Sequence, residues 1–211
     1  NQLLERPFDI GDFQNQFEQI NNNFNLEKQQ LNNGEKQNFK NISQENSNQI
    51  KKLSKNIENL LKKNIADSHA EDADDLRQIL DNLFEISFNQ ERIITDYDNV
   101  NYTNPLYQDR ILEQSQLVEN FKIVRDSLYN LSRRSEFIGN HISKAAFMIE
   151  DGMTKACLQL QERNTSLAGR SQRESLKNAN DLILILSESL KNIDNASASS
   201  GGKSSKRKKK P

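Results

Sequence analysis

The 211-residue chain combines a small apolar fraction with many charges, which excludes a single large globular core. Only 34% of its residues are hydrophobic, 28% are charged, and the formal net charge is −1. Since only three prolines and seven glycines interrupt a sequence rich in Leu, Ile, Glu, Lys, Gln and Asn, the composition favours long helices. We therefore expect an all-α fold, an elongated antiparallel helical bundle preceded by a coiled-coil-like helical hairpin.

Signals for a membrane or a compartment are missing from the sequence. No apolar run approaches the roughly 20 residues that cross a bilayer, and the start lacks the basic and apolar pattern of a signal peptide. Because the chain begins at Asn1, we expect it to be a piece of a longer protein. Cys157 is the single cysteine, which excludes an internal disulfide, and its surroundings predict a small buried residue rather than a reactive thiol.

Residues 1–66 have the apolar spacing of a coiled-coil-like hairpin. The first helix carries apolar residues at intervals of three, four and seven: Ile10, Phe13, Phe17, Ile20, Phe24 and Leu31. Gly34 is predicted to end this helix. The second helix resumes the pattern with Phe39, Ile42, Ile50, Leu53, Ile57, Leu60 and Leu61. Between Ile42 and Ile50 the register slips, and Asn46 and Gln49 take core positions, which predicts weak packing or local unwinding there.

A third helix is predicted to begin at Ser68, because Ser68 and Glu71 have the spacing of a capping box. Its apolar band is wider than those before it: Leu76, Ile79, Leu80, Leu83, Phe84, Ile86 and Phe88. The acidic residues between Asp67 and Asp75 could be taken for a calcium site, but they lack the Asp-x-Asp-x-Asp-Gly loop with its distal Glu. We interpret them as partners of the positive end of the helix dipole.

Three further helices are predicted between residues 105 and 195. Asn104 and Pro105 start the fourth, which extends to about Arg134. Its core positions are Leu117, Phe121, Val124, Leu128 and Leu131. Ser135 and Gly139 indicate a kink or short break before the fifth helix, with a continuous helix as the alternative. NTSLAGR (164–170) is predicted to be a turn, and SQRE (171–174) to cap a sixth helix that ends near Asn195. Its core positions are Leu176, Ala179, Ile183, Leu186, Leu190 and Ile193.

The last part, residues 196–211, is predicted to be a disordered basic Ser/Gly/Lys linker or tail. The division predicted for the whole chain is thus a hairpin at 1–66, a bundle at 67–195 and this tail. Gly202-Lys203-Ser204 is no phosphate-binding loop, because Ser197 replaces the first glycine of that motif and no strand precedes it. Candidates for contact with an anionic partner are Lys203, Lys206, Arg207, Lys208, Lys209 and Lys210.

Residues for catalysis or metal binding do not form a recognisable pattern. His69 and His141 have no partner at a zinc-like spacing. Cys157 and His141 are sixteen residues apart on one predicted helix, about 24 Å along its axis, too far for a nucleophile and its base. We therefore predict that the protein is not an enzyme and that it uses no metal and no cofactor.

Several segments between residues 70 and 195 resemble, in order and spacing, an uncharacterised protein family. They are LRQILDNLFEISFNQERI (76–93), NP (104–105), FKIVRDSLYNLSRRS (121–135), LQERN (160–164) and SLKNANDLILILSESL (175–190). The family comprises large Bacteroidota envelope proteins that share a domain of unknown function, with membrane helices near the N-terminus and a long helical, Gln- and Met-rich C-terminal region. SLKNIDNASASS (189–200) departs from that Gln- and Met-rich pattern, and the first 66 residues match weakly.

The resemblance implies a membrane-anchored parent protein in which this stretch is an interaction module on the periplasmic side of the cell envelope. It carries over no catalytic residues. Within DSLYNLSRR (126–134), Arg133 and Arg134 could bind acidic groups of a partner and Tyr129 could anchor an interface. The alternative, which we favour, is that Tyr129 half-covers the core and the arginines lie favourably at a helix C-terminus.

Two functions remain in competition. The leading hypothesis is a non-enzymatic scaffold that binds envelope components or itself through long helical seams, in an assembly such as secretion or gliding machinery, and that reaches the membrane only through segments outside this chain. The alternative is nucleic-acid binding through the basic tail. Against it, residues 67–104 hold 2 basic and 10 acidic side chains, and the helical part shows no basic face.

Overall fold

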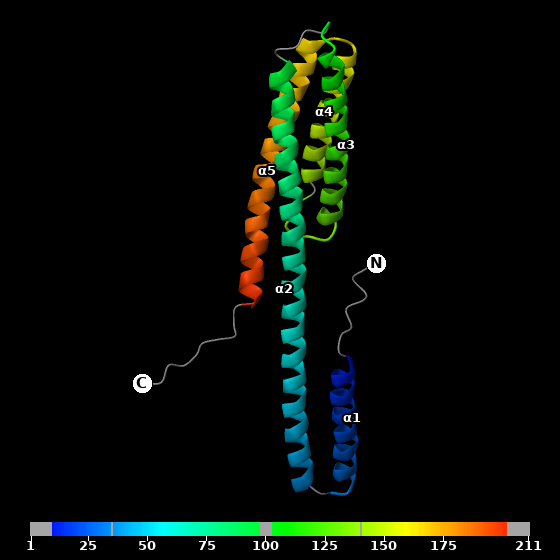
Figure 1. Ribbon diagram of the computed structural model, residues 1–211. Helices are drawn as coiled ribbons and strands as arrows, with labels where there is room; N and C mark the ends of the chain where they lie inside the picture. The colour runs from blue at the N-terminus through cyan, green and yellow to red at the C-terminus, as the bar shows by residue number, and fades with distance from the viewer. Residues whose placement is uncertain (1–9, 35, 98–102, 140, 202–211) are drawn as a thin grey trace, which may run out of the picture. The chain divides into compact units, whose positions relative to one another are not determined.

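The computed structural model describes residues 10–34, 36–97, 103–139 and 141–201, which form five α-helices and no strand (Figure 1). This confirms the predicted all-α fold. The helices are α1 Ile10–Asn32, α2 Lys36–Tyr97, α3 Leu106–Ser132, α4 His141–Gln161 and α5 Thr165–Gly201. The chain divides into two compact units, unit 1 at Asn1–Asn64 and unit 2 at Ile65–Pro211. Helix α2 contributes a segment to each unit. None of the described helices is long and apolar enough to span a bilayer.

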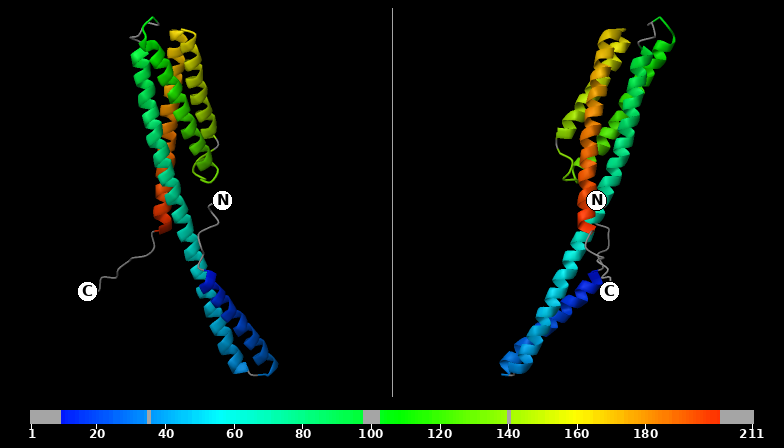
Figure 2. Two further views of the ribbon diagram at one scale, coloured as in Figure 1. Left: turned by 45° about the vertical axis from the view of Figure 1, so that its right-hand side comes forward. Right: turned by 90° about the vertical axis from the view of Figure 1, so that its left-hand side faces the viewer.

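Unit 1 is a helical hairpin in which α1 and the first part of α2 lie side by side (Figures 1 and 2). The turn contains Gly34 at φ +74°, a conformation that glycine adopts without the steric cost of a side chain. The Asn33 N–H donates to the Gln29 carbonyl at 3.0 Å, and the Gly34 N–H to the Leu31 carbonyl at 3.3 Å. These contacts end α1 where the sequence predicts its end.

Unit 2 is an antiparallel four-helix bundle made from the second part of α2, α3, α4 and α5 (Figure 2). Helix α4 packs against both α3 and α5. Helix α2 closes the ring, since Gln90 bonds to Gln114 of α3 and the Ser87 hydroxyl donates to the Asn180 side chain of α5 at 2.7 Å. Short connections between consecutive helices make this an up-down-up-down bundle.

The core of unit 2 comes from all four helices. The five predicted core positions of α3 are buried, as are Leu76, Ile79, Leu80, Leu83 and Ile86 of α2. Tyr107 is also buried, and its hydroxyl donates to the Leu160 carbonyl at 2.8 Å. Phe84 and Phe88 differ from the prediction, because both are exposed. At 100° per residue, Phe84 and Phe88 are rotated by roughly 80° and 120° from the buried Leu76, so they point away from the core.

The predicted helix start at Ser68 is wrong, because α2 continues through it from Lys36 to Tyr97. Residues 62–72 contain neither glycine nor proline, so nothing interrupts the backbone hydrogen bonds of the helix. A capping box acts only at the N-terminus of a helix, where the first backbone N–H groups have no partner within the helix. The interpretation of the nearby acidic residues as partners of a helix N-terminus is therefore also wrong. Asp72 is instead buried against Arg134.

The helix is interrupted between α3 and α4, in agreement with one of the two predicted alternatives. The N–H groups of Arg134 and Ser135 both donate to the Leu131 carbonyl, at 3.1 and 2.9 Å, which closes the last turn of α3. Ile138 is buried in the connection and anchors it to the core. The break allows α4 to fold back onto α3 instead of extending it.

Helix α5 is longer at both ends than predicted. It begins at Thr165, because Arg163 adopts φ +62° and the side-chain oxygen of Asn164 accepts the Leu167 N–H at 3.3 Å. Asn164 is thus the cap of this helix, and the predicted turn at 164–170 and capping box at 171–174 are wrong. The helix ends at Gly201, beyond the predicted end near Asn195. The first residues of the predicted disordered tail are therefore helical.

Candidate interaction surface

Metal-binding clusters are absent from the part of the chain that the structure describes, where no three His, Cys, Asp or Glu side chains are arranged around a common point. His69 packs its ring edge-on against Phe137, with centroids 5.3 Å apart, and its Nε2 lies 4.0 Å from a carboxylate oxygen of Glu136. These contacts attach the connection between α3 and α4 to helix α2. The side chain of His141 lies outside the described residues.

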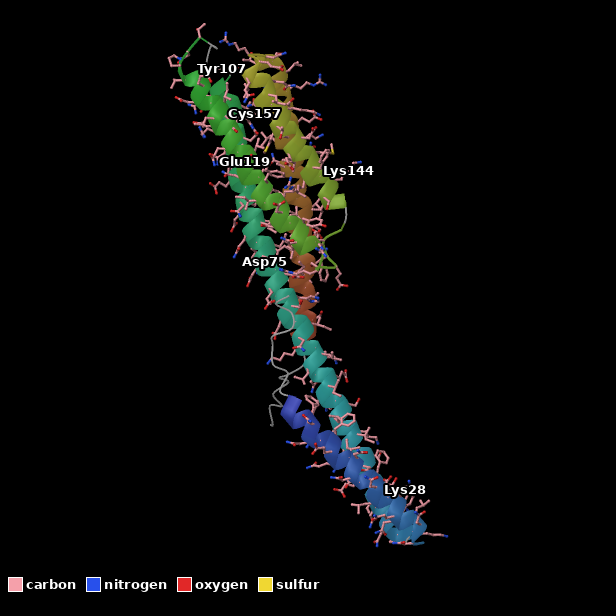
Figure 3. The ribbon with its side chains drawn as sticks, turned by 90° about the vertical axis from the view of Figure 1, so that its right-hand side faces the viewer. Lys28, Asp75, Tyr107, Glu119, Lys144 and Cys157 are labelled. Atoms are coloured by element: carbon pink, nitrogen blue, oxygen red, sulfur yellow. The ribbon has the colours of Figure 1, made fainter. Side chains whose placement is uncertain are left out.

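Cys157 has the features of a packing residue. It is half-buried on α4 and lies toward the same end of unit 2 as Tyr107 (Figure 3). Desolvation by burial raises the pKa of its thiol, and a hydrogen bond with Ser115 only partly opposes this effect. A raised pKa reduces the thiolate fraction, which is the nucleophilic form. The residue is therefore a poor candidate for covalent chemistry.

The three residues predicted to contact a partner near the end of α3 have different surroundings. Tyr129 and Arg133 are exposed. Arg134 is engaged within unit 2, where its Nε donates to Asp72 at 2.8 Å and its Nη2 pairs with Asp75. Desolvation works to lower the pKa of Arg134, but the hydrogen bonds to the two carboxylates outweigh it and raise that pKa. Arg134 thus holds α3 to α2, and partner binding by Tyr129 and Arg133 stays a prediction.

The predicted anionic-partner tail lies outside the described residues. This holds for Lys203, Lys206, Arg207, Lys208, Lys209 and Lys210, which all follow Gly201. The proposed contact with anionic partners therefore stays a prediction.

The most distinctive surface of unit 1 is a set of large apolar side chains that the hairpin does not cover. We call it the hairpin face, and its members are Phe17, Phe24 and Leu31 of α1 and Ile50, Ile57 and Leu61 of α2. Their exposed fractions lie between 42% and 66%. The sequence predicted apolar seams through these residues, and the hairpin leaves all six partly exposed.

Helical geometry places these six residues on one side of the hairpin. At 100° per residue, Phe17, Phe24 and Leu31 are rotated from the buried Ile20 by roughly 20–60° in one sense. Ile50, Ile57 and Leu61 are rotated from the buried Leu53 by roughly 40–80° in the same sense. Because the two helices are antiparallel, rotations of the same sense lead to the same side. The hairpin face is therefore continuous across both helices.

Polar residues close the opposite edge and occupy the interior of the hairpin. The Asn23 amide donates to the Gln49 side chain at 3.3 Å, and both residues are rotated away from the hairpin face. Asn46 is buried, and its amide has no hydrogen-bond partner among the described residues. A buried unpaired amide costs stability. The space between α1 and α2 is thus partly polar, which leaves most of the apolar surface of unit 1 outside it.

A shallow groove adjoins the hairpin face on the α2 side, near the turn. It is lined by residues of α2 alone, namely Lys36, Phe39, Lys40, Ser43, Gln44 and Ser47. Lys28 of α1 lies toward the same end of the hairpin (Figure 3). Helix α2 therefore has a shallow depression near the turn, next to the part of the hairpin face that carries Ile50, Ile57 and Leu61.

Comparison of the chain with protein-family models, with curated proteins and with solved structures gives no match. The functional argument therefore rests on the geometry of the two units.

Proposed function

We propose that the protein is a non-enzymatic helical scaffold that binds proteins through the hairpin face. The observation that carries the proposal is the alignment of six large, half-exposed apolar side chains on one side of a two-helix unit. Contiguous apolar surface of this kind marks interaction sites in soluble proteins. Two helices alone also bury too little apolar area for a stable core, so unit 1 gains stability from any helical partner that covers this side.

Unit 2, in contrast to unit 1, covers its own apolar residues, as expected for the part of a scaffold that gives structural support. Its seam residues are buried within one chain, and side-chain hydrogen bonds and ion pairs connect all four helices. Arg125 of α3, for example, pairs with Glu150 of α4 at 2.5 Å. We infer that unit 2 is the stable part of the scaffold and unit 1 the part that binds.

The proposed setting is a larger cell-envelope protein, with this stretch on the periplasmic side and within an assembly such as secretion or gliding machinery. The resemblance of residues 70–195 to the Bacteroidota envelope family supports this setting. In that arrangement, segments outside this chain anchor the parent protein in the membrane.

Site-specific photo-crosslinking in the cells of origin tests the proposal. A photoreactive residue replaces Phe24 in the hairpin face or, as a control, Phe147, an outward-facing residue of α4 that is 66% exposed. We expect a discrete crosslinked protein from position 24 and none from position 147. The product should disappear when Ile57→Gln is added to the same face. No product from position 24, or the same products from both positions, would contradict the proposal.

A further inference from the structure

We propose that the hairpin face binds the hairpin face of a second copy of this chain, so that two hairpins form an intermolecular four-helix bundle. The inference rests on the proposed function and names its partner. Three observations point to a second copy: the area of the face, the levels at which its residues lie on the two helices, and the regular spacing of those residues.

The exposed area fits a dimer interface. Each of the six side chains leaves about half of its surface exposed. With roughly 150–200 Å² for a fully exposed side chain of this size, the face offers about 500 Å² per hairpin. Two faces together bury about 1,000 Å² before the surrounding polar atoms are counted, which approaches the size of a specific interface. The area of two hairpin faces is therefore at the lower limit for a specific dimer.

The levels of the two helices decide which residues of two copies would meet. Helix α1 presents Phe17, Phe24 and Leu31, and α2 presents Ile50, Ile57 and Leu61 beside the shallow depression that Ser43 and Ser47 help to line. The Asn23–Gln49 hydrogen bond shows which residues of the two helices lie at the same height along the hairpin axis. Because the helices are antiparallel, each step forward from Asn23 on α1 corresponds to a step back from Gln49 on α2. Phe24 therefore lies at the height of Asn48, and Leu31 at the height of Asn41.

In the proposed dimer, a two-fold axis parallel to the helices relates the two hairpins. This axis places α1 of one copy over α2 of the other, and each residue keeps its height along the axis. Phe24 then meets the α2 surface near Ser47, and Leu31 meets it near Ser43. Each copy thus places α1 side chains on the α2 surface of the other copy, and the same contact is made twice, as in an isologous dimer.

The spacing also suits a helical bundle. Phe17, Phe24 and Leu31 recur every seven residues, and so do Ile50 and Ile57. A seven-residue repeat keeps side chains along a continuous seam when helices supercoil around each other. The partner of this face is therefore a pair of helices with the same repeat, as the second copy has.

Sedimentation of the full 211-residue chain is the first test. We expect a reversible change from 24.3 kDa to twice that mass between about 1 and 200 μM, a range typical of moderate affinity. The double variant Phe17→Gln/Phe24→Gln should weaken dimerisation at least tenfold. Phe147→Gln is the matched control, since Phe147 and Phe17 are equally exposed at 66%, and it should leave the dimerisation constant unchanged.

Disulfide trapping tests the orientation and does not depend on destabilising the hairpin. In a Cys157→Ser background, a Leu31→Cys copy is mixed with a Ser43→Cys copy under mild oxidation. We expect mixed disulfide dimers, because the two positions meet across the proposed interface. Asn41→Cys is the matched control: Asn41 lies level with Leu31 but is rotated to the other side of α2, and it should form few mixed dimers.

A chain that remains monomeric at 200 μM overturns the inference. So does a dimer that Phe17→Gln/Phe24→Gln leaves intact, or equal trapping at positions 43 and 41. If the chain is monomeric but position 24 crosslinks to a different protein in cells, the second copy is excluded and the proposed function stands. If position 24 also fails to crosslink, both are refuted.

Discussion

Three buried glutamines in unit 2 give the sharpest test of how this bundle is specified. Gln90 of α2, Gln114 of α3 and Gln172 of α5 are at most 1% exposed. Gln90 and Gln114 exchange two hydrogen bonds, at 3.0 and 3.1 Å, and Gln172 donates to the Gln114 oxygen at 2.8 Å. Gln114 therefore takes part in all three bonds and connects three helices.

The substitution Gln114→Met removes these three bonds and keeps the side-chain volume nearly constant. It leaves the buried Gln90 amide and the buried Gln172 donor unpaired. At about 1–3 kcal/mol for each buried unpaired polar group, we expect unfolding of unit 2 to become easier by about 3–5 kcal/mol. Replacing all three glutamines by methionine leaves no unpaired group. The triple variant should therefore lie within about 1 kcal/mol of the wild type or be more stable.

Urea unfolding followed by the near-ultraviolet tyrosine signal measures this difference in unit 2 alone. The chain has four tyrosines and no tryptophan, and all four, Tyr97, Tyr102, Tyr107 and Tyr129, belong to unit 2. With a slope of about 1–3 kcal/mol per molar urea, the single variant should lower the midpoint by about 1–5 M. A single variant within 1 kcal/mol of the wild type, or a triple variant less stable than the single one, would refute the reasoning.

Two further predictions concern packing and pH in unit 2. Gly152→Ala should destabilise the bundle by about 1–2 kcal/mol, because a Cβ there would lie 3.0 Å from the Ser175 Cβ of α5. Gly169→Ala, whose Cβ would meet only the flexible Arg173 guanidinium, should instead stabilise by up to about 1 kcal/mol in the same urea assay. Desolvation would raise the pKa of Glu113, but Arg110 and Arg92 hold it below its ordinary value of 4.5. Such a lowered pKa stabilises the fold above pH 4.5, and this contribution disappears as the pH falls through the folded-state pKa. Glu113→Gln should thus be less stable than the wild type at pH 7, by less than about 1 kcal/mol, and this difference should shrink as the pH falls below 4.5. A difference that stays constant down to acid unfolding would exclude this origin.

The apolar pattern predicted most of unit 2. In α3 the predicted core positions are all buried, and Gly34, Asn104 and the break near Ser135 act where the sequence placed them. The Asn104 side chain, for example, accepts the Leu106 N–H at 3.0 Å. These signals are local, since a cap or a turn depends on residues within a few positions of itself. Local signals can be read without knowing the partner helix.

The errors arose where local signals conflict with longer-range contacts. Ser68 and Ser171 have capping partners at the right spacing, but both lie inside helices. Ser171 instead donates to Gln159 of α4 at 2.9 Å. The glutamine network and the Arg134–Asp72 pair were also missed, because each joins residues more than 20 positions apart. Sequence spacing within one helix contains no information about such pairs.

The same seven-residue spacing leads to different outcomes in the two units, and the number of helices explains why. In unit 2 each helix has two neighbours, so a wide apolar band is covered from both sides. In unit 1 each helix has one neighbour within the unit, and polar residues such as Asn23, Asn46 and Gln49 take the positions between the two helices. Apolar residues rotated only a few tens of degrees from Ile20 and Leu53 then remain outside. In the proposed dimer, a second copy of the chain covers the side that this two-helix unit leaves open.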